Sequence, residues 1–212
     1  MAFAIETLTV ADEPAAWARA GFTVDDDGTC RVGSVRVELD PEAGPGGIVS
    51  WTIAGVDDAG VIDGLPTVDG TRGPVEPASH PNGTTQIDHV VVATPDLDRT
   101  VGALRMFGFV PRRTREAGRS RQTFFRLGEV ILEVVGPSGR DAERATAPAT
   151  FWGLAFTVED LTATAAALAR HLGPVKDAVQ PGRRIATLRH EPLGISVPVA
   201  FMSADTADRG TP

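Results

Sequence analysis

The sequence contains a single cysteine, Cys30, among 212 residues. An internal disulfide therefore cannot form, and a zinc site built from several thiolates is excluded. No stretch approaches the roughly 20 apolar residues that a membrane helix needs. The first ten residues have neither a basic region nor a long apolar run. We therefore expect no export signal, no membrane association and a cytoplasmic location.

Positive charge is also scarce, because 20 lysines and arginines face 28 aspartates and glutamates, which leaves a formal net charge of −8. A chain of this charge repels phosphate backbones and anionic lipid, so we expect no nucleic-acid partner. The nucleotide-binding patterns GxxxxGK[ST] and GxGxxG are absent, as is the nucleophile pattern GxSxG. Hydrophobic residues make up 42% of the chain, which is enough for a globular core.

An order of strand, helix and three further strands occurs twice along the chain. Residues 86–135 contain the first copy and residues 151–202 the second, each with β-branched runs around one helical segment. Gly128 marks a hairpin turn in the first copy, and Gly194 stands in the matching place before the last strand of the second. The sequence therefore predicts two βαβββ modules.

A poorer copy of the same unit precedes these two modules, within residues 1–62. Its glutamate Glu38 stands five residues after Gly33, as Glu133 stands five residues after Gly128. This spacing predicts a degenerate N-terminal module that arose from the same repeat.

Composition predicts where these units begin and end. Residues 48–56 resemble the opening strand of a fourth copy, whose helix and later strands we expect to be lost. Residues 63–85 are rich in Gly, Pro, Ser, Asn and Asp and predict an exposed, irregular linker. The two complete modules then form one domain over residues 86–204, and residues 205–212 form a frayed tail.

Three segments of the two modules resemble a known family. They are 87–98 (IDHVVVATPDLD), 128–135 (GEVILEVV) and 153–161 (GLAFTVEDL). In order and spacing they are similar to the vicinal oxygen chelate superfamily, which includes glyoxalase I, bleomycin-resistance proteins and extradiol dioxygenases. The resemblance implies an α+β fold in which paired βαβββ modules form a curled mixed sheet with a central cleft. It covers residues 86–203 well and the N-terminal module weakly.

The same resemblance implies four inward-pointing ligands for a divalent metal. On the family's motif these positions fall on His89, Glu133 and Gly153, and the fourth, counted from Gly194 as Glu133 is from Gly128, falls on Val199. The last two offer no donor atom, and an ion held by one imidazole and one carboxylate would be bound weakly. We therefore predict no metal cofactor. The alternative is a divalent ion (Zn, Fe, Mn, Mg or Ni) that takes further ligands from outside the motif.

Glu133 and His89 are candidate catalytic residues even without a metal. Strand alternation places His89 on one face with Ile87 and Val91, and the apolar character of the strand around Glu133 suggests cover on both sides. A buried carboxylate must find a partner or be protonated, and a carboxylate beside an imidazole raises its basicity. Acid–base catalysis is therefore one interpretation. The alternative is structural, with Glu133 paired to an arginine or to His89 and the imidazole satisfied in the core.

Candidate ligand contacts lie on the predicted strands and turns around the cleft. Gln180, Arg183 and Arg184 surround a glycine on a turn, where two guanidinium groups suit a carboxylate or phosphate. Exposed arginines on a polar turn are the alternative interpretation. The remaining candidates are Arg121, Gln122, Phe124, Phe151 and Val199.

An apolar surface at the two lost ligand positions favours a hydrophobic or aromatic small molecule. The sequence thus predicts a protein that binds a small molecule in the cleft between modules, as a binding or sequestering protein or as a metal-independent isomerase or lyase. A divalent-metal lyase, isomerase or dioxygenase is the second interpretation, and a scaffold that binds a partner through its surface is the third. A homodimer agrees with the resemblance, because members of the superfamily pair modules across a dimer.

Overall fold

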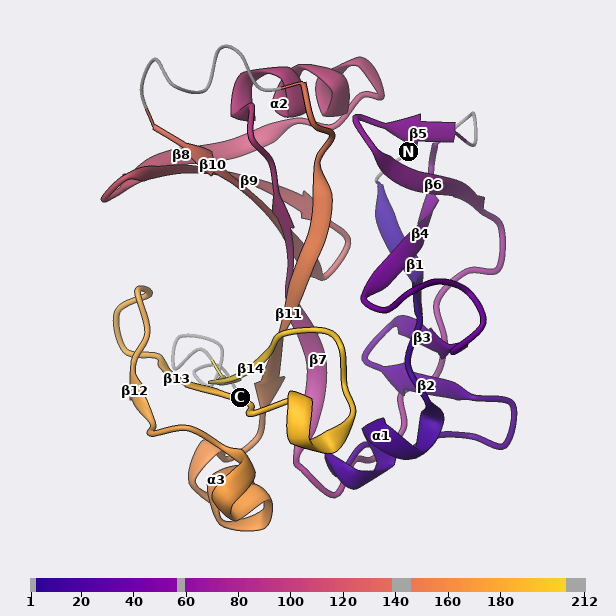
Figure 1. The fold of residues 1–212 in the computed structure, drawn as a ribbon, viewed down its shortest axis with the longest axis vertical. Coiled ribbons are helices and arrows are strands. Elements are labelled where there is room, and N and C mark those ends of the chain that lie inside the picture. Colours follow the sequence, from indigo (N-terminus) through magenta and orange to yellow (C-terminus); the bar gives the residue numbers. More distant parts are fainter. Residues whose placement is uncertain (1–2, 57–59, 139–145, 205–212) are drawn as a thin grey trace, which may run out of the picture.

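The computed structural model describes residues 3–56, 60–138 and 146–204. These residues form a six-stranded and an eight-stranded sheet, both mixed, with helices at their margins (Figure 1). The α+β architecture of curled sheets predicted from the sequence is confirmed. The predicted tail at 205–212 lies outside the described residues.

The first sheet contains the N-terminal module and part of another, in the order β2-β3-β1-β4-β6-β5. Its elements are β1 (Ala4–Val10), α1 (Pro14–Arg19), β2 (Thr29–Val32), β3 (Val35–Leu39), β4 (Ile48–Ala54), β5 (Gly60–Ile62) and β6 (Leu65–Gly70). β1 runs parallel to β3, β4 runs parallel to β6, and β1 and β4 are antiparallel. The prediction that the fourth copy had lost its later strands is therefore wrong. Only residues 55–59 separate β4 from β5, which is too short for a helix of several turns.

The prediction of an exposed irregular chain over 63–85 holds only in part: residues 71–83 have no strand or helix and are mostly exposed, whereas residues 65–70 form β6. Leu65 and Thr67 are buried in β6, where their two-residue alternation is masked by the glycines and prolines around them. Further along, buried Asn82 donates through Nδ2 to the carbonyl oxygen of Ala20 at 3.0 Å. The two ends of the segment are therefore packed, and the part between them is exposed.

The second sheet contains the two complete modules, in the order β12-β13-β14-β11-β7-β10-β9-β8. The first module consists of β7 (Thr84–Ala93), α2 (Leu97–Met106), β8 (Pro111–Ala117), β9 (Ser120–Leu127) and β10 (Val130–Pro137). The second consists of β11 (Thr150–Val158), α3 (Leu161–Leu168), β12 (Lys176–Asp177), β13 (Arg184–Thr187) and β14 (Val199–Ser203). Single 3₁₀ turns at Ala169–His171 and Glu191–Leu193 complete it. β7 pairs with β11 in antiparallel fashion, so the modules are related by an approximate twofold axis.

The two long helices begin in the same way. Asp96 Oδ1 accepts from the backbone N–H of Arg99 at 3.0 Å, and Asp160 Oδ1 accepts from the backbone N–H of Thr162 at 2.7 Å. Such N-caps satisfy donors that the first helical turn leaves free. Asp96 and Asp160 are therefore equivalent positions in the two modules. Placing one on the other aligns the modules residue by residue. None of the helices that the structure describes is long and apolar enough to cross a membrane.

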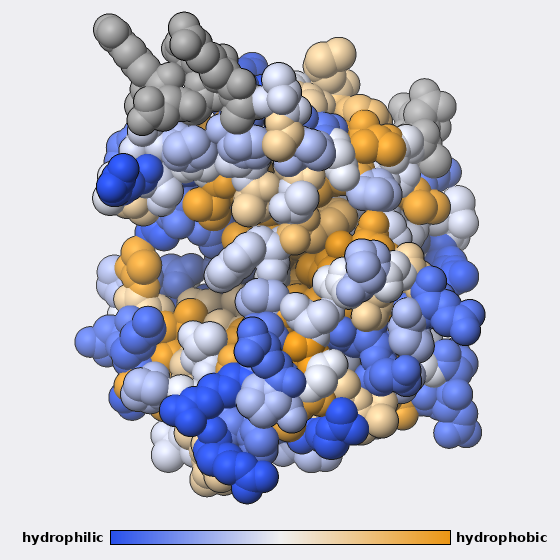
Figure 2. Space-filling view, viewed as in Figure 1, coloured by the Kyte–Doolittle hydropathy of each residue, from blue (hydrophilic) through white to orange (hydrophobic). Residues whose placement is uncertain are grey.

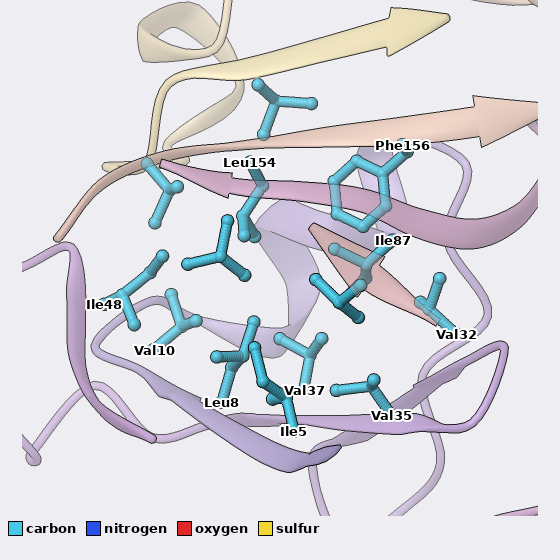
Figure 3. Packing of buried hydrophobic residues seen from close by; sticks show 14 of the residues in the cluster. Ile5, Leu8, Val10, Val32, Val35, Val37, Ile48, Ile87, Leu154 and Phe156 are labelled. Carbon is cyan, nitrogen blue, oxygen red and sulfur yellow. The ribbon is translucent and has the colours of Figure 1, made fainter. Parts of the chain in front are cut away.

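The main core lies between the two sheets, where β1 and β3 face β7 and β11 (Figure 3). Ile87, Leu154 and Phe156 point from the second sheet toward residues such as Leu8 and Val37 of the first. Burial of this apolar surface is the dominant favourable term in folding. It also leaves the opposite face of the second sheet free, and the cleft forms on that face.

Candidate functional site

A cleft of about 470 Å³ lies on the free face of the second sheet. Its floor is formed by β7 and β11, and its walls come from β8–β10 of one module and β12–β14 of the other. Figure 2 shows the surface hollowed between these two arms. This volume is in the range of pockets that hold small organic ligands.

A β-bulge determines which side chains of β7 reach the cleft. The register with β11 shifts between the pairs Phe156–Ile87 and Ala155–His89, so Asp88 is an extra residue in β7. Ile87 consequently points into the core, while His89 lines the cleft. The expectation that these two side chains share a face is therefore wrong, because strict alternation does not hold through the bulge.

Asp88 is the centre of a buried polar cluster beneath the cleft. Its Oδ1 accepts from His89 Nδ1 at 2.7 Å, and its Oδ2 accepts from Thr157 Oγ1 at 2.8 Å and from the guanidinium of Arg183. Burial alone raises the pKa of Asp88, but the hydrogen bonds and charges of His89 and Arg183 outweigh it and hold that pKa well below its usual range. The cluster fixes the orientation of the His89 ring.

Arg183 is therefore not a ligand contact, contrary to the prediction. It is 8% exposed, and its Nε donates to the carbonyl oxygen of Ser203 at 2.8 Å while its Nη2 pairs with Asp88. Its neighbour Arg184 points outward at the start of β13 and does not line the cleft. Arg183 and Arg184 therefore do not form the predicted anion-binding pair, because the first is buried and the second is exposed to solvent.

Glu133 lies on β10 beside Val91 of β7, with His89 diagonally adjacent. Burial raises the pKa of Glu133, and the nearby charges of His89 and Arg115 lower it to a smaller extent. Within the described residues no side chain hydrogen-bonds or ion-pairs with its carboxylate. Glu133 was predicted to pair with an arginine or with His89, but in the structure it interacts with Arg115 and His89 only through their charges. Its carboxyl group faces the cleft.

Strand register corrects one of the predicted ligand positions. In the first module Glu133 pairs with Val91, and in the second the matching pair is Ala200 with Ala155. Ala200 therefore takes the place of Glu133, whereas Val199 pairs one residue earlier, with Leu154; it is buried in the core and also borders the cleft, as predicted for a lining residue. The count from the turn glycine failed because the chain between that glycine and β14 is not a strand.

The residues present do not fit a metal centre of four protein ligands. Aligning the helix caps Asp96 and Asp160 makes Gly153 of the second module the equivalent of His89, and the side chains of Gly153 and Ala200 offer no donor atoms. Across residues 3–56, 60–138 and 146–204, no three side chains of His, Cys, Asp or Glu converge. His89 and Glu133 thus remain as two donors, fewer than structural or catalytic metal sites use.

The other predicted contacts divide into those at the cleft and those elsewhere. Gln122, Phe124 and Gln180 line it. Arg121 is instead paired with Asp98, and the Phe151 ring packs against Trp51 at 5.1 Å. Sequence reasoning missed three residues that the site depends on, namely Asp88, Arg113 and Arg115. The Arg-Thr-Arg alternation on β8 was a usable signal for two of them, since it places both arginines on one face.

Residues 88–187 match the model of the glyoxalase/bleomycin resistance protein/dioxygenase superfamily. The match runs from Asp88 in β7 to Thr187 at the end of β13 and leaves out β14, the last strand of the second module. Over these residues the resemblance to the vicinal oxygen chelate superfamily that the motifs predicted is confirmed. A search of curated proteins found no match.

Solved structures share the fold at low sequence identity. A mutant of 4-hydroxymandelate synthase from Streptomyces coelicolor is 14% identical, with 95% of this chain and 92% of that chain covered and a TM-score of 0.63. A xylose isomerase-like TIM barrel/4-hydroxyphenylpyruvate dioxygenase fusion protein is 15% identical, with 99% and 51% covered and a TM-score of 0.61. Methylmalonyl-CoA epimerase from Mycobacterium tuberculosis is 18% identical over 60% of this chain and 94% of that chain, with a TM-score of 0.46. The first two matches extend over nearly the whole chain, so the shared fold includes the six-stranded sheet.

Proposed function

We propose that the protein binds a small organic molecule in the cleft between its two complete modules, without a metal held by four protein ligands. The observation that supports this is the chemistry of the ligand positions. Two of the four carry no donor, and Ala200 and Ala155 leave that part of the floor apolar. Such a floor suits hydrophobic or aromatic groups better than a chelated ion.

The test is a variant that fills the cleft. Ala200→Trp places an indole on the floor, and we expect it to abolish the thermal stabilisation that small aromatic acids give the wild-type protein. A ligand at 100 times its Kd stabilises the native state by about 2.7 kcal/mol. Differential scanning fluorimetry of both proteins measures this difference.

Met106→Trp is the matched control, because Met106 is 89% exposed on α2, away from the cleft. Stabilisation that persists in Ala200→Trp would show that the ligand binds elsewhere. Elemental analysis of protein purified without chelator tests the metal-dependent alternative. A stoichiometric divalent ion that disappears in His89→Ala would overturn the proposal in favour of a metal enzyme.

A second candidate is a metal-independent isomerase or lyase that moves a proton through Glu133. The cleft supplies a carboxyl group with a raised pKa and no hydrogen-bond partner in the described structure, close to the imidazole of His89. A general base works best when its pKa approaches the operating pH. Burial therefore shifts Glu133 in the direction that this chemistry requires.

This candidate predicts exchange of the acidic C–H of a bound aromatic 2-oxo acid with D₂O. We expect Glu133→Gln to slow enzyme-dependent exchange by about 100-fold or more, the usual contribution of a general base. Proton NMR of the 2-oxo acid follows the exchange against a protein-free reference. Equal exchange rates in the wild type and in Glu133→Gln would leave the protein as a binding protein only.

A further inference from the structure

We infer that the ligand of this cleft is an organic anion with an apolar body, and that Arg113 and Arg115 hold its charged group. The inference rests on the proposed function and specifies the ligand class. It is carried by three features of the cleft: the geometry of the two arginines, the absence of an ion pair to either of them among the described residues, and the apolar wall that faces them.

The two arginines project from one face of β8 onto a single aromatic ring. Thr114 separates them, so strand alternation turns both guanidinium groups toward the cleft. Their Cζ atoms lie 5.2 and 5.3 Å from the centroid of the Phe124 ring. Stacking on an aromatic ring holds a guanidinium in place while its N–H donors stay available at the edge.

Neither arginine has a carboxylate partner in the part of the chain that the structure describes. The arginines that do form ion pairs there are Arg31, Arg72, Arg99, Arg121 and Arg183. Arg115 donates through Nε only to the neutral side chain of Gln122, at 2.6 Å. Two like charges on one ring repel each other, and the acid nearest to them in the cleft, Glu133, interacts with Arg115 only through space and forms no ion pair with either arginine. A carboxylate or sulfonate can accept from both guanidinium groups and remove that repulsion.

The opposite side of the cleft is apolar. Val179 lines it and Trp152 lines the adjoining floor on β11, although they are 72% and 57% exposed, and large exposed apolar side chains around a pocket mark ligand contacts. Ile185 and Met202 extend this surface inward. The only charges on this wall are those of Lys176 and Asp177, which are adjacent in sequence and of opposite sign. The cleft thus has a cationic wall and an apolar wall, the arrangement that fits an aromatic acid.

A matched pair of fluorescent probes tests the inference. 8-Anilinonaphthalene-1-sulfonate and N-phenyl-1-naphthylamine share the same rings, and only the first carries an anionic group. We expect Arg113→Met/Arg115→Met to weaken binding of the sulfonate by about tenfold or more, since hydrogen bonds to charged groups contribute most to such contacts. The neutral probe should keep its affinity within about twofold, which also shows that the cleft of the variant is intact. Fluorescence titration measures both affinities.

Two controls separate the possible failures. Arg119→Met removes an exposed arginine of the β8–β9 turn and should leave both affinities unchanged. Ala200→Trp should abolish binding of both probes. If the double arginine variant binds the sulfonate as the wild type does while Ala200→Trp binds neither probe, the inference about the anion is wrong and the proposed function stands. If neither probe binds the wild type, or Ala200→Trp leaves binding unaffected, the proposed function fails as well.

Discussion

Asp88→Ala is expected to lower the free energy of unfolding by about 3–5 kcal/mol at pH 7, the usual cost of removing one partner of a buried ion pair. The variant leaves the guanidinium of Arg183 buried without its carboxylate, although Arg183 keeps its hydrogen bond to Ser203. His89 Nδ1 and Thr157 Oγ1 lose their acceptor in the same step. Urea unfolding followed by circular dichroism measures the difference.

The pH dependence of the same variant follows from the depressed pKa of Asp88. A carboxyl group whose pKa is lower in the folded than in the unfolded state stabilises the fold above its unfolded pKa, about 3.9, and this contribution is lost as the pH falls. The gap between wild type and Asp88→Ala should therefore be full at pH 7 and narrow progressively below about pH 5. Asp98→Ala is the control, because Asp98 is 84% exposed in its pair with Arg121 and should cost less than about 1 kcal/mol. Equal costs for the two variants would contradict the structural role of the buried cluster.

The features that the sequence predicted well depend on neighbours along the chain. Gly33 and Gly128 both adopt positive φ, at 57° and 66°, in the hairpin turns where their modules require it. Asp96 and Asp160 cap their helices through backbone groups two or three residues ahead. Signals of this range repeat whenever the module repeats, so the order of strands and helices could be recognised without knowledge of how the sheets pair.

The features that were missed depend on partners far away in the sequence. Whether Asp88 bulges is decided by pairing with β11, and its partner Arg183 lies 95 positions away. The first sheet shows the same device, because β1 and β4 shift register at Glu6. Glu6 accepts from the backbone N–H groups of Arg72 and Gly73 at 3.0 and 2.9 Å. In both sheets a buried acid on the opening strand receives donors from a distant segment, which no local pattern reveals.

Phe156→Ala is the second substitution from which we expect a large effect, about 3–5 kcal/mol of lost stability. Phe156 is fully buried on β11, and its ring centroid lies 5.0 Å from that of Phe22 and 6.1 Å from those of Trp17 and Phe201. Trp17 and Phe22 belong to the N-terminal module, while Phe201 belongs to β14. The substitution therefore opens a cavity at the contact between the two sheets and removes several aromatic pairs at once.

Because the cavity borders both sheets, we expect Phe156→Ala to destabilise them together, in one cooperative transition. In a Trp152→Phe background, fluorescence reports on the N-terminal region alone, since Trp17 and Trp51 are then the only tryptophans. Circular dichroism reports on all strands, and coincident urea transitions by the two probes indicate a single unit. Met106→Ala, at an exposed apolar site, should shift neither transition by more than about 0.5 kcal/mol. A fluorescence transition that stays in place while the dichroism transition moves would show that the N-terminal sheet folds independently of the domain that carries the cleft.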